Sequence, residues 1–172
     1  SISYIAANPL PVFQNFTGQH RCFLDGINPL QLSNYEGLIV SSNLSKYKTL
    51  TGNNKITINE SLPIVSLSNK QADKSVFGII SLSTDKSDIT QEIIQKYREN
   101  GDTRVEINSL GEGSLWVIET GGNLESGDYI CSSDIPGYGM KQTDDIQRNY
   151  TVAKATMDCD FQGLLIQDTK IK

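Results

Sequence analysis

The sequence has 172 residues, a formal net charge of −5 and a pI near 4.8. This acidic balance argues against a nucleic-acid or anionic-membrane partner, because binding to phosphate groups needs clustered Lys and Arg side chains. Hydrophobic residues make up 37% of the chain and aromatic residues 8%, which is lean for a self-sufficient globular domain. We therefore expect a partner, or further copies of the chain, to complete part of its apolar surface.

A chain of this length is expected to form one domain with a core of its own. No apolar run approaches the roughly 20 residues of a membrane span. The first residues also lack the charged start and apolar centre of a signal peptide. Because the chain begins with Ser1 instead of Met, we expect it to be a fragment or a processed product of a longer protein.

Residues 1–16 contain Pro9 and Pro11 and have no hydrophobic period, so we interpret them as an extended arm or linker. A single mainly-β domain is expected at 17–172. Short apolar segments typical of strands recur there, at 17–23, 36–41, 56–58, 59–67, 76–81, 105–107, 115–117, 129–131, 150–157 and 164–166. Between them we expect a loop at 28–34, a solvated loop at 69–74 and a polar loop at 141–149, and residues 42–55 are also polar.

One helix is predicted, from Ile89 to Asn100. Asp88 can cap its first turn and Gln91 can complete a capping box, while Gly101 stops it. The sequence shows about ten short strands, this single short helix and no alternation of strands with helices. This pattern predicts a mainly-β sandwich or barrel.

The stretch from Val105 to Met140 organises the chain, because it holds the only Trp and two sharp turns between apolar runs. Gly121-Gly122 is expected to close one strand, since glycine reaches positive φ at little steric cost. Gly127-Asp128 is expected to start the next strand, and residues 135–139 form a rigid turn after it. Gly78, inside its own strand, suggests a bulge or a close backbone approach. These features indicate a scaffold and not an active-site loop.

The sequence offers few candidate residues for a metal or cofactor site. Cys22, Cys131 and Cys159 are widely spaced, so they are interpreted as buried small hydrophobic residues, not as a zinc site or disulfide framework. The sole histidine, His20, is interpreted as a structural or surface residue in preference to a catalytic one. Asp158 and Asp160 are either a weak cation site or a solvated turn, and the turn is favoured. No phosphate-loop, dinucleotide or zinc-protease motif is present, and the sequence predicts no metal and no cofactor.

Glu60 and Glu112 are the two candidate acid–base residues, because both lie in apolar or glycine-rich surroundings. A buried carboxylate there would have a raised pKa and could serve as a general acid or base. The alternative, which is favoured, is a carboxylate that accepts hydrogen bonds from turn amides or faces water.

Several segments resemble, in order and spacing, the C-terminal intramolecular-chaperone and autoproteolytic-cleavage domain of viral and phage tail, appendage and fibre-like proteins. The resemblance covers most of 17–161, and its main segments are TGQHRC at 17–22, GLIV at 37–40, INESLPIVSLS at 58–68, VFGIIS at 76–81, INSLGEGSLWV at 107–117, GGNLESGDYICSS at 121–133, IPGYGMKQ at 135–142 and NYTVAKATMDCDF at 149–161. The motif residues to which it assigns a structural role are Gly78, Ser109, Gly111, Glu112, Gly113, Trp116, Gly127, Asp128, Pro136, Gly137 and Gly139.

The resemblance implies a homotrimeric domain that follows a fibre stalk in the virion, made in the host cytoplasm, and that sets the three chains in register as they fold. In autoproteolytic members the domain is then cut from the fibre at its N-terminal boundary. The only enzymatic activity implied is therefore a single-turnover cleavage of its own chain, of the glutamic-peptidase class. Glu60, in the segment N-E-x-L-P, and Ser1 are the candidate catalytic residues.

A second function is kept open, in which the domain stays on the fibre as a receptor- or glycan-binding tip. Exposed aromatic side chains on a concave face, at Tyr35, Tyr47 or Tyr138, would favour this alternative.

Overall fold

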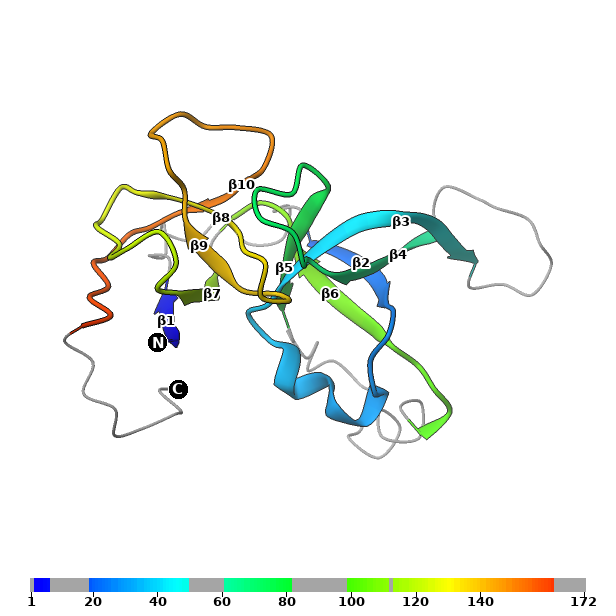
Figure 1. The fold of residues 1–172 in the computed structure, drawn as a ribbon. Helices are drawn as coiled ribbons and strands as arrows, with labels where there is room; N and C mark the ends of the chain where they lie inside the picture. The colour runs from blue at the N-terminus through cyan, green and yellow to red at the C-terminus, as the bar shows by residue number, and fades with distance from the viewer. Residues whose placement is uncertain (1, 7–18, 50–60, 82–98, 112, 163–172) are drawn as a thin grey trace.

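The computed structural model describes residues 2–6, 19–49, 61–81, 99–111 and 113–162 (Figure 1). Within these residues the fold is mainly β, with ten strands and one short 3-10 helix. The predicted class, a mainly-β sandwich or barrel, is confirmed, and five of the strands form a closed barrel. No helix among the described residues is long and apolar enough to cross a membrane.

Five strands form a closed barrel. Their order around it is β2 (Gln19–Leu24), β4 (Ser61–Leu67), β3 (Ile39–Thr49), β5 (Val76–Ser81) and β6 (Arg104–Asn108). Only the β2–β4 pair is parallel, and β6 pairs back onto β2 with His20 opposite Ile107. Closure leaves these strands without a free edge in the sheet.

The barrel encloses its own apolar core. Along β6, Val105 and Ile107 are buried while their neighbours are only half-buried, as expected where successive side chains point to opposite faces. The buried residues of this core are Cys22, Leu24, Leu32, Leu38, Val40, Val65, Ile80, Val105 and Ile107.

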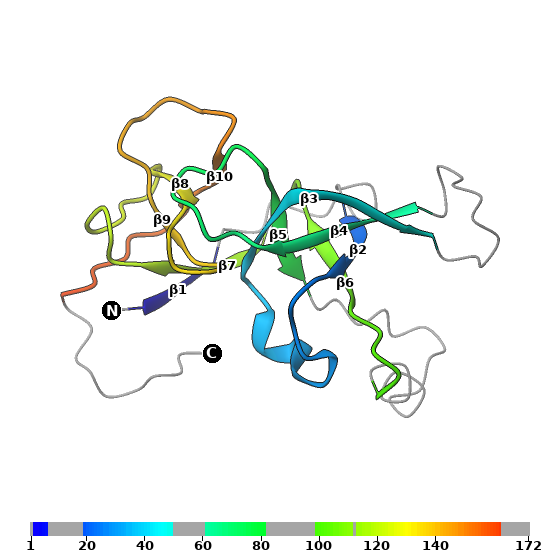
Figure 2. The same cartoon turned by 45° about the vertical axis from the view of Figure 1, so that its right-hand side comes forward.

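The other five strands form an open sheet beside the barrel (Figure 2). Their order is β1 (Ile2–Ala6), β7 (Ser114–Ile118), β9 (Gly139–Lys141), β8 (Tyr129–Ser132) and β10 (Thr151–Lys154). Neighbouring strands are antiparallel except β7 and β9. Strands β1 and β10 are the edges of this sheet.

The barrel and the open sheet are joined through the shared wall formed by β3 and β5. Ile39 and Val40 are adjacent and both fully buried, yet Ile39 packs in the core of the open sheet and Val40 in the core of the barrel. On β5, Ile80 packs inside the barrel while Ile79 and Val76 pack against the other core. One strand pair therefore contributes side chains to both cores.

The observed helix η1 spans Pro29–Tyr35, where the sequence was interpreted as a loop, so that interpretation was wrong. The Asn28 side chain caps this helix by accepting a hydrogen bond of 3.0 Å from the Leu30 amide, and Pro29 fills the first turn. An Asn cap followed by Pro is a helix-start signal that the sequence contains. Only residues 99 and 100 of the predicted helix at 89–100 are described.

Three strand predictions need correction. Strand β3 continues through the polar stretch to Thr49 because that stretch pairs with β4, with Tyr47 opposite Pro63. Strand β9 was not predicted as a strand. Strand β10 ends at Lys154 instead of residue 157, because the regular pairing with β8 stops there. The Asp128 amide donates to the Glu125 carbonyl, and the Gly127 amide donates to the Ala155 carbonyl in its place. The predicted strands at 56–58 and 164–166 lie outside the described residues.

The expected N-terminal arm includes strand β1, whose five residues pair with β7. Residues 7–16 of the arm are outside the described part of the chain.

Candidate functional site

A buried cluster of polar side chains lies where the barrel meets the open sheet. Ser41 comes from β3, Asp73 from the β4–β5 loop and Ser132 from β8. The Ser41 hydroxyl donates to Asp73 Oδ2 at 2.7 Å, and the Asp73 amide donates to Ser132 Oγ at 2.9 Å. The Ser132 hydroxyl in turn donates to the Lys70 carbonyl at 2.8 Å. We call Ser41, Asp73 and Ser132 the joint cluster.

The joint cluster is built to hold an ionised carboxylate. Asp73 is 6% exposed, and burial by itself would raise its pKa. Hydrogen bonds from Ser41 and from the Ser75 amide, with the charge of Lys70, outweigh burial and lower the pKa of Asp73 below its usual value. A carboxylate with a lowered pKa is a weak base, and the Ser41 hydroxyl is fully buried. The pair therefore lacks the accessible nucleophile and tuned base that catalysis needs.

The rigid turn between β8 and β9 is clamped at the same junction. The Gly137 amide donates to the Ser68 carbonyl, and the Gly137 carbonyl accepts from the Ile39 amide, both at 2.7 Å. Gly137 has φ of +81°, and a Cβ there would lie 2.9 Å from Leu38 Cβ. Glycine is therefore needed for both the backbone conformation and the close approach to the barrel.

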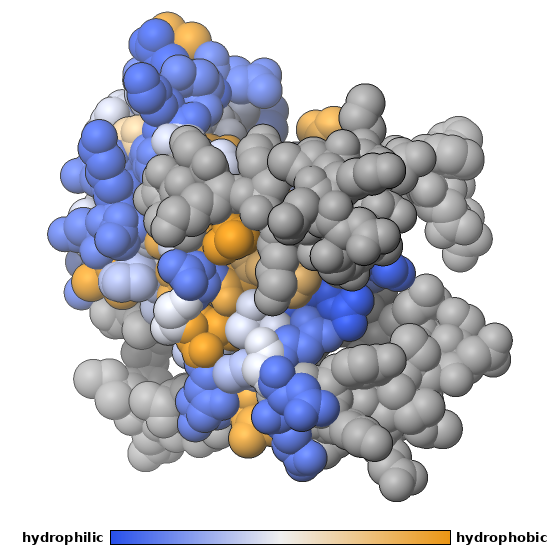
Figure 3. Space-filling model, turned by 90° about the vertical axis from the view of Figure 1, so that its right-hand side faces the viewer, coloured by the Kyte–Doolittle hydropathy of each residue, from blue (hydrophilic) through white to orange (hydrophobic). Residues whose placement is uncertain are grey.

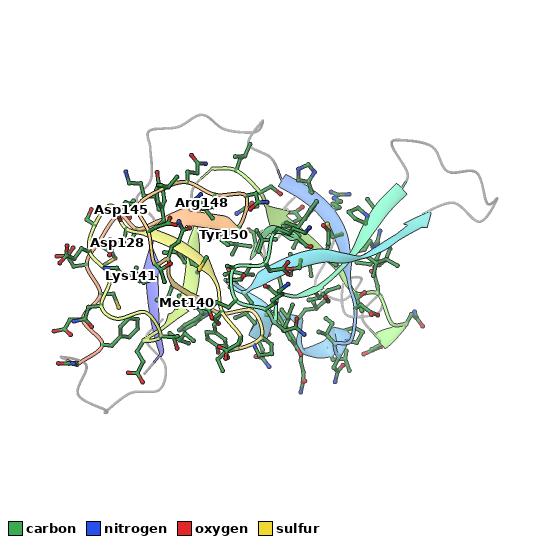
Figure 4. All side chains as sticks on the ribbon, turned by 45° about the horizontal axis from the view of Figure 1, so that its top comes forward. Asp128, Met140, Lys141, Asp145, Arg148 and Tyr150 are labelled. Carbon is green, nitrogen blue, oxygen red and sulfur yellow. The ribbon has the colours of Figure 1, made fainter. Side chains whose placement is uncertain are left out.

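A second polar cluster lies on the surface of the open sheet. Figure 4 shows Asp128, Lys141, Asp145 and Arg148 gathered near the start of β8, the end of β9 and the loop after it. Lys141 Nζ lies 2.7 Å from Asp128 Oδ2, which also accepts from the Glu125 amide at 2.8 Å. We call this set of four the surface charge cluster.

The pKa directions in the surface charge cluster favour ion pairs over acid–base chemistry. Burial would raise the pKa of Asp128, but hydrogen bonds from the Glu125 amide and Lys141 lower it overall. The hydrogen bond to Asp128 raises the pKa of Lys141, and nearby Asp145 adds to this shift. A general acid needs a raised carboxyl pKa and a nucleophilic lysine needs a lowered one, so both shifts have the wrong sign.

An apolar layer supports this surface. Met140 is buried in a small cluster with Ile118 and Cys131, and Tyr150 packs against this cluster. Above this layer, Arg148 Nη2 lies 3.0 Å from Asp144 Oδ2. The surface charge cluster therefore lies over a packed apolar layer of the open sheet.

The predicted catalytic candidates are not placed by the structure, because Glu60, Ser1 and Glu112 lie outside the described residues. His20 is exposed, and its ring centroid lies 5.5 Å from that of Phe77. Among the residues that are described, no group of three or more His, Cys, Asp or Glu side chains could hold a metal ion.

The three cysteines are buried, whereas Asp158 and Asp160 are exposed. Cys22, Cys131 and Cys159 are all buried, as predicted, and burial raises the pKa of Cys22 to about 12. Asp158 accepts a hydrogen bond from the Ser126 amide, and Asp160 accepts from the Asn123 side chain and the Gln162 amide. Both aspartates are exposed, in agreement with the solvated-turn interpretation.

The structure brings two of the motif residues together at a bulge in β5. The β3–β5 register moves from Val40 opposite Gly78 to Ser41 opposite Val76, so the predicted bulge is confirmed. A Cβ at Gly78 would lie 2.5 Å from the Asn108 carbonyl oxygen of β6. The Ser109 hydroxyl also donates to the Phe77 carbonyl at 2.8 Å.

The other described motif residues lie at turns and packing contacts. Gly111, Gly127 and Gly137 have positive φ, whereas Gly113 does not. Gly121 and its neighbour Gly122 also have positive φ, which confirms the predicted turn. Trp116 Nε1, on β7, donates to the carbonyl of Glu36, just before β3, at 2.9 Å.

The Gly139 and Pro136 positions complete this group of motif residues. A Cβ at Gly139 would lie 2.8 Å from Ile130 Cγ2 and 3.0 Å from Leu115 Cδ1, inside the open-sheet core. Pro136 lies in the turn whose Tyr138 amide donates to the Ile135 carbonyl at 3.0 Å.

Sequence reasoning missed the joint cluster. Asp73 was expected in a solvated loop, and that expectation was wrong because the carboxylate is buried against Ser41. Its three members come from segments 32 and 59 residues apart. No local pattern could have found them.

Comparison of the chain with protein families, curated proteins and solved structures finds no match.

Proposed function

We propose that the chain is a structural β domain of a viral fibre-like protein that assembles as a homotrimer and holds three chains in register. The observation that supports it best is that the clustered polar side chains make their hydrogen bonds and ion pairs within the chain. In the described residues, the joint cluster and the surface charge cluster bind the chain's own backbone and side chains. This arrangement suits a rigid scaffold better than an enzyme acting on separate substrates.

Exposed apolar side chains support assembly with further copies. Leu110, at the tip between β6 and β7, is 75% exposed, and four other large apolar side chains are 45–57% exposed, namely Leu30, Ile135, Ile146 and Met157. Figure 3 also shows apolar atoms gathered on the barrel side of the molecule. Isolated exposed apolar residues are common, so the support comes from their combination with the lean hydrophobic composition.

Self-cleavage at the N-terminal boundary remains a prediction from the resemblance, since neither Glu60 nor Ser1 is among the described residues. It is tested by the intact mass, under denaturing conditions, of a longer chain that carries about fifty native residues before Ser1. A split near Ser1 that Glu60→Gln abolishes is the expected result. A chain that stays intact would contradict the cleavage prediction and leave the trimer proposal standing.

The receptor- or glycan-binding alternative has less support. Tyr35 and Tyr138 are half-buried and pack against the barrel core, so neither is a fully exposed aromatic side chain. The side chain of Tyr47 lies outside the described part.

The registration function is tested by joining the chain to the C-terminal end of a collagen-like repeat that finds its register slowly on its own. Triple-helix recovery after heating is followed by circular dichroism over a range of concentrations. We expect faster recovery that depends little on concentration, because the domain would hold the three repeat ends together. The controls are the repeat alone and the repeat joined to an unrelated monomeric domain. Recovery no faster than in the controls would contradict the proposal.

A further inference from the structure

Strand β1 has a single strand neighbour in the described structure. Ile2–Ala6 pairs antiparallel with β7 along its whole length, from Ile2 opposite Ile118 to Ala6 opposite Ser114, without a bulge. It forms one edge of the open sheet, next to the marked N-terminus in Figures 1 and 2. Strand β1 therefore extends the open sheet by one edge strand, and its pairing with β7 is its only strand pairing in the described structure.

Strands β1 and β2 are consecutive in the chain but belong to different sheets. Strand β1 lies in the open sheet and β2 in the barrel, and residues 7–18 separate them. Twelve residues can span up to about 40 Å when fully extended. A connection of this length can lead to β7 of the same chain or to β7 of an adjacent copy.

Strand β7 has the properties of a strand acceptor. Its other neighbour is β9, with Val117 opposite Gly139, so β1 occupies the remaining edge. Leu115 and Val117 are buried at 2% and 0% exposure. Without β1, the backbone donors and acceptors of a strand with buried apolar side chains would be open, and such an edge pairs readily with an added strand.

We propose that β1 of each chain pairs with β7 of an adjacent copy in the assembled protein, so that the subunits exchange their N-terminal strands. This inference rests on the proposed homotrimer. The exchanged pair keeps the register and backbone hydrogen bonds seen within one chain, because every copy has the same β1 and β7 sequences. If each subunit donates one strand and accepts one, three chains form a closed ring.

Two variants with one added cysteine each test the exchange directly. Ala6 and Ser114 lie opposite each other in the register, so Ala6→Cys on one chain and Ser114→Cys on another can be bridged across the pair. The two chains, with different tags, are co-expressed and then oxidised or treated with a short bis-maleimide. The native cysteines are buried, which limits background reaction. We expect a covalent heterodimer that is absent when Ser126→Cys, at an exposed position in a different turn, replaces Ser114→Cys.

The double variant with both cysteines in one chain separates the possible outcomes. Exchange predicts covalent species up to the trimer on a non-reducing gel. A trimer by light scattering with only an intrachain bridge would overturn strand exchange and leave the homotrimer proposal intact. A monomer with an intrachain bridge would overturn both. Absence of any bridge would contradict the β1–β7 pairing and with it the exchange.

Discussion

Two buried serines near the junction of the sheets should respond in opposite ways to truncation. Ser41 and Ser68 are both 0% exposed. The Ser41 hydroxyl donates to Asp73 at 2.7 Å, whereas Ser68 Oγ has no hydrogen-bond partner in the described structure. Ser41→Ala and Ser68→Ala therefore delete the same atom from equally buried sites that differ in hydrogen bonding.

The expected magnitudes follow from the group that each mutation leaves behind. Ser41→Ala removes a hydrogen bond to an ionised carboxylate and leaves Asp73 with its amide donor from Ser75. A hydrogen bond to a charged group contributes about 1.5–3 kcal/mol, so we expect a loss of about 2 kcal/mol. Ser68→Ala removes a buried hydroxyl that has lost its water without gaining a partner. It should be neutral or stabilise by up to about 1 kcal/mol.

Urea unfolding at one fixed chain concentration measures both changes, followed by the fluorescence of Trp116, the only tryptophan. The double variant Ser41→Ala with Asp73→Asn is the control, because Ser41→Ala should cost less once the charge is removed. Equal free energies of unfolding for the two serine variants, within about 0.5 kcal/mol, would refute the assigned role of the joint cluster.

Three further predictions concern backbone, packing and pH. Gly127 has φ of +106°, so Gly127→Val should destabilise the fold by about 2 kcal/mol in urea unfolding. Gly113 does not have a positive φ, so Gly113→Ala should be nearly neutral. Equal effects of the two variants would contradict the turn assignment. Gly139→Ala should lower the melting temperature, because its Cβ would meet Ile130 Cγ2 at 2.8 Å, and an unchanged value in calorimetry would count against that packing. The folded-state pKa values of Asp73 and Asp128 lie below those of the unfolded chain. The stability that these carboxylates contribute is therefore complete above about pH 5 and falls as the pH drops through about 4; a free energy of unfolding that rises on acidification over this window would show the opposite sign.

Local sequence patterns predicted the elements whose signals lie within a few residues. The alternation around Val105 and Leu115 marked β6 and β7, and the glycine pair at Gly121 marked the turn after them. Gly78 was also interpreted correctly, because a glycine within an apolar strand usually reflects a bulge or a close backbone.

The features that depend on distant partners could not be predicted. The polar end of β3 is a strand because β4 pairs with it, and β9 is only three residues long. The burial of Asp73 depends on Ser41 and Ser132, which only the folded chain brings to it. Tertiary pairing decided these elements, and single-residue preferences are weaker than that pairing.

The molar mass of the folded chain in solution tests the central proposal most directly. Size-exclusion chromatography with multi-angle light scattering, at micromolar concentration and neutral pH, gives this mass without reference to shape. The proposal predicts three times the chain mass of 19.0 kDa across the whole peak. A constant mass of 19.0 kDa at the highest attainable concentration would contradict self-assembly.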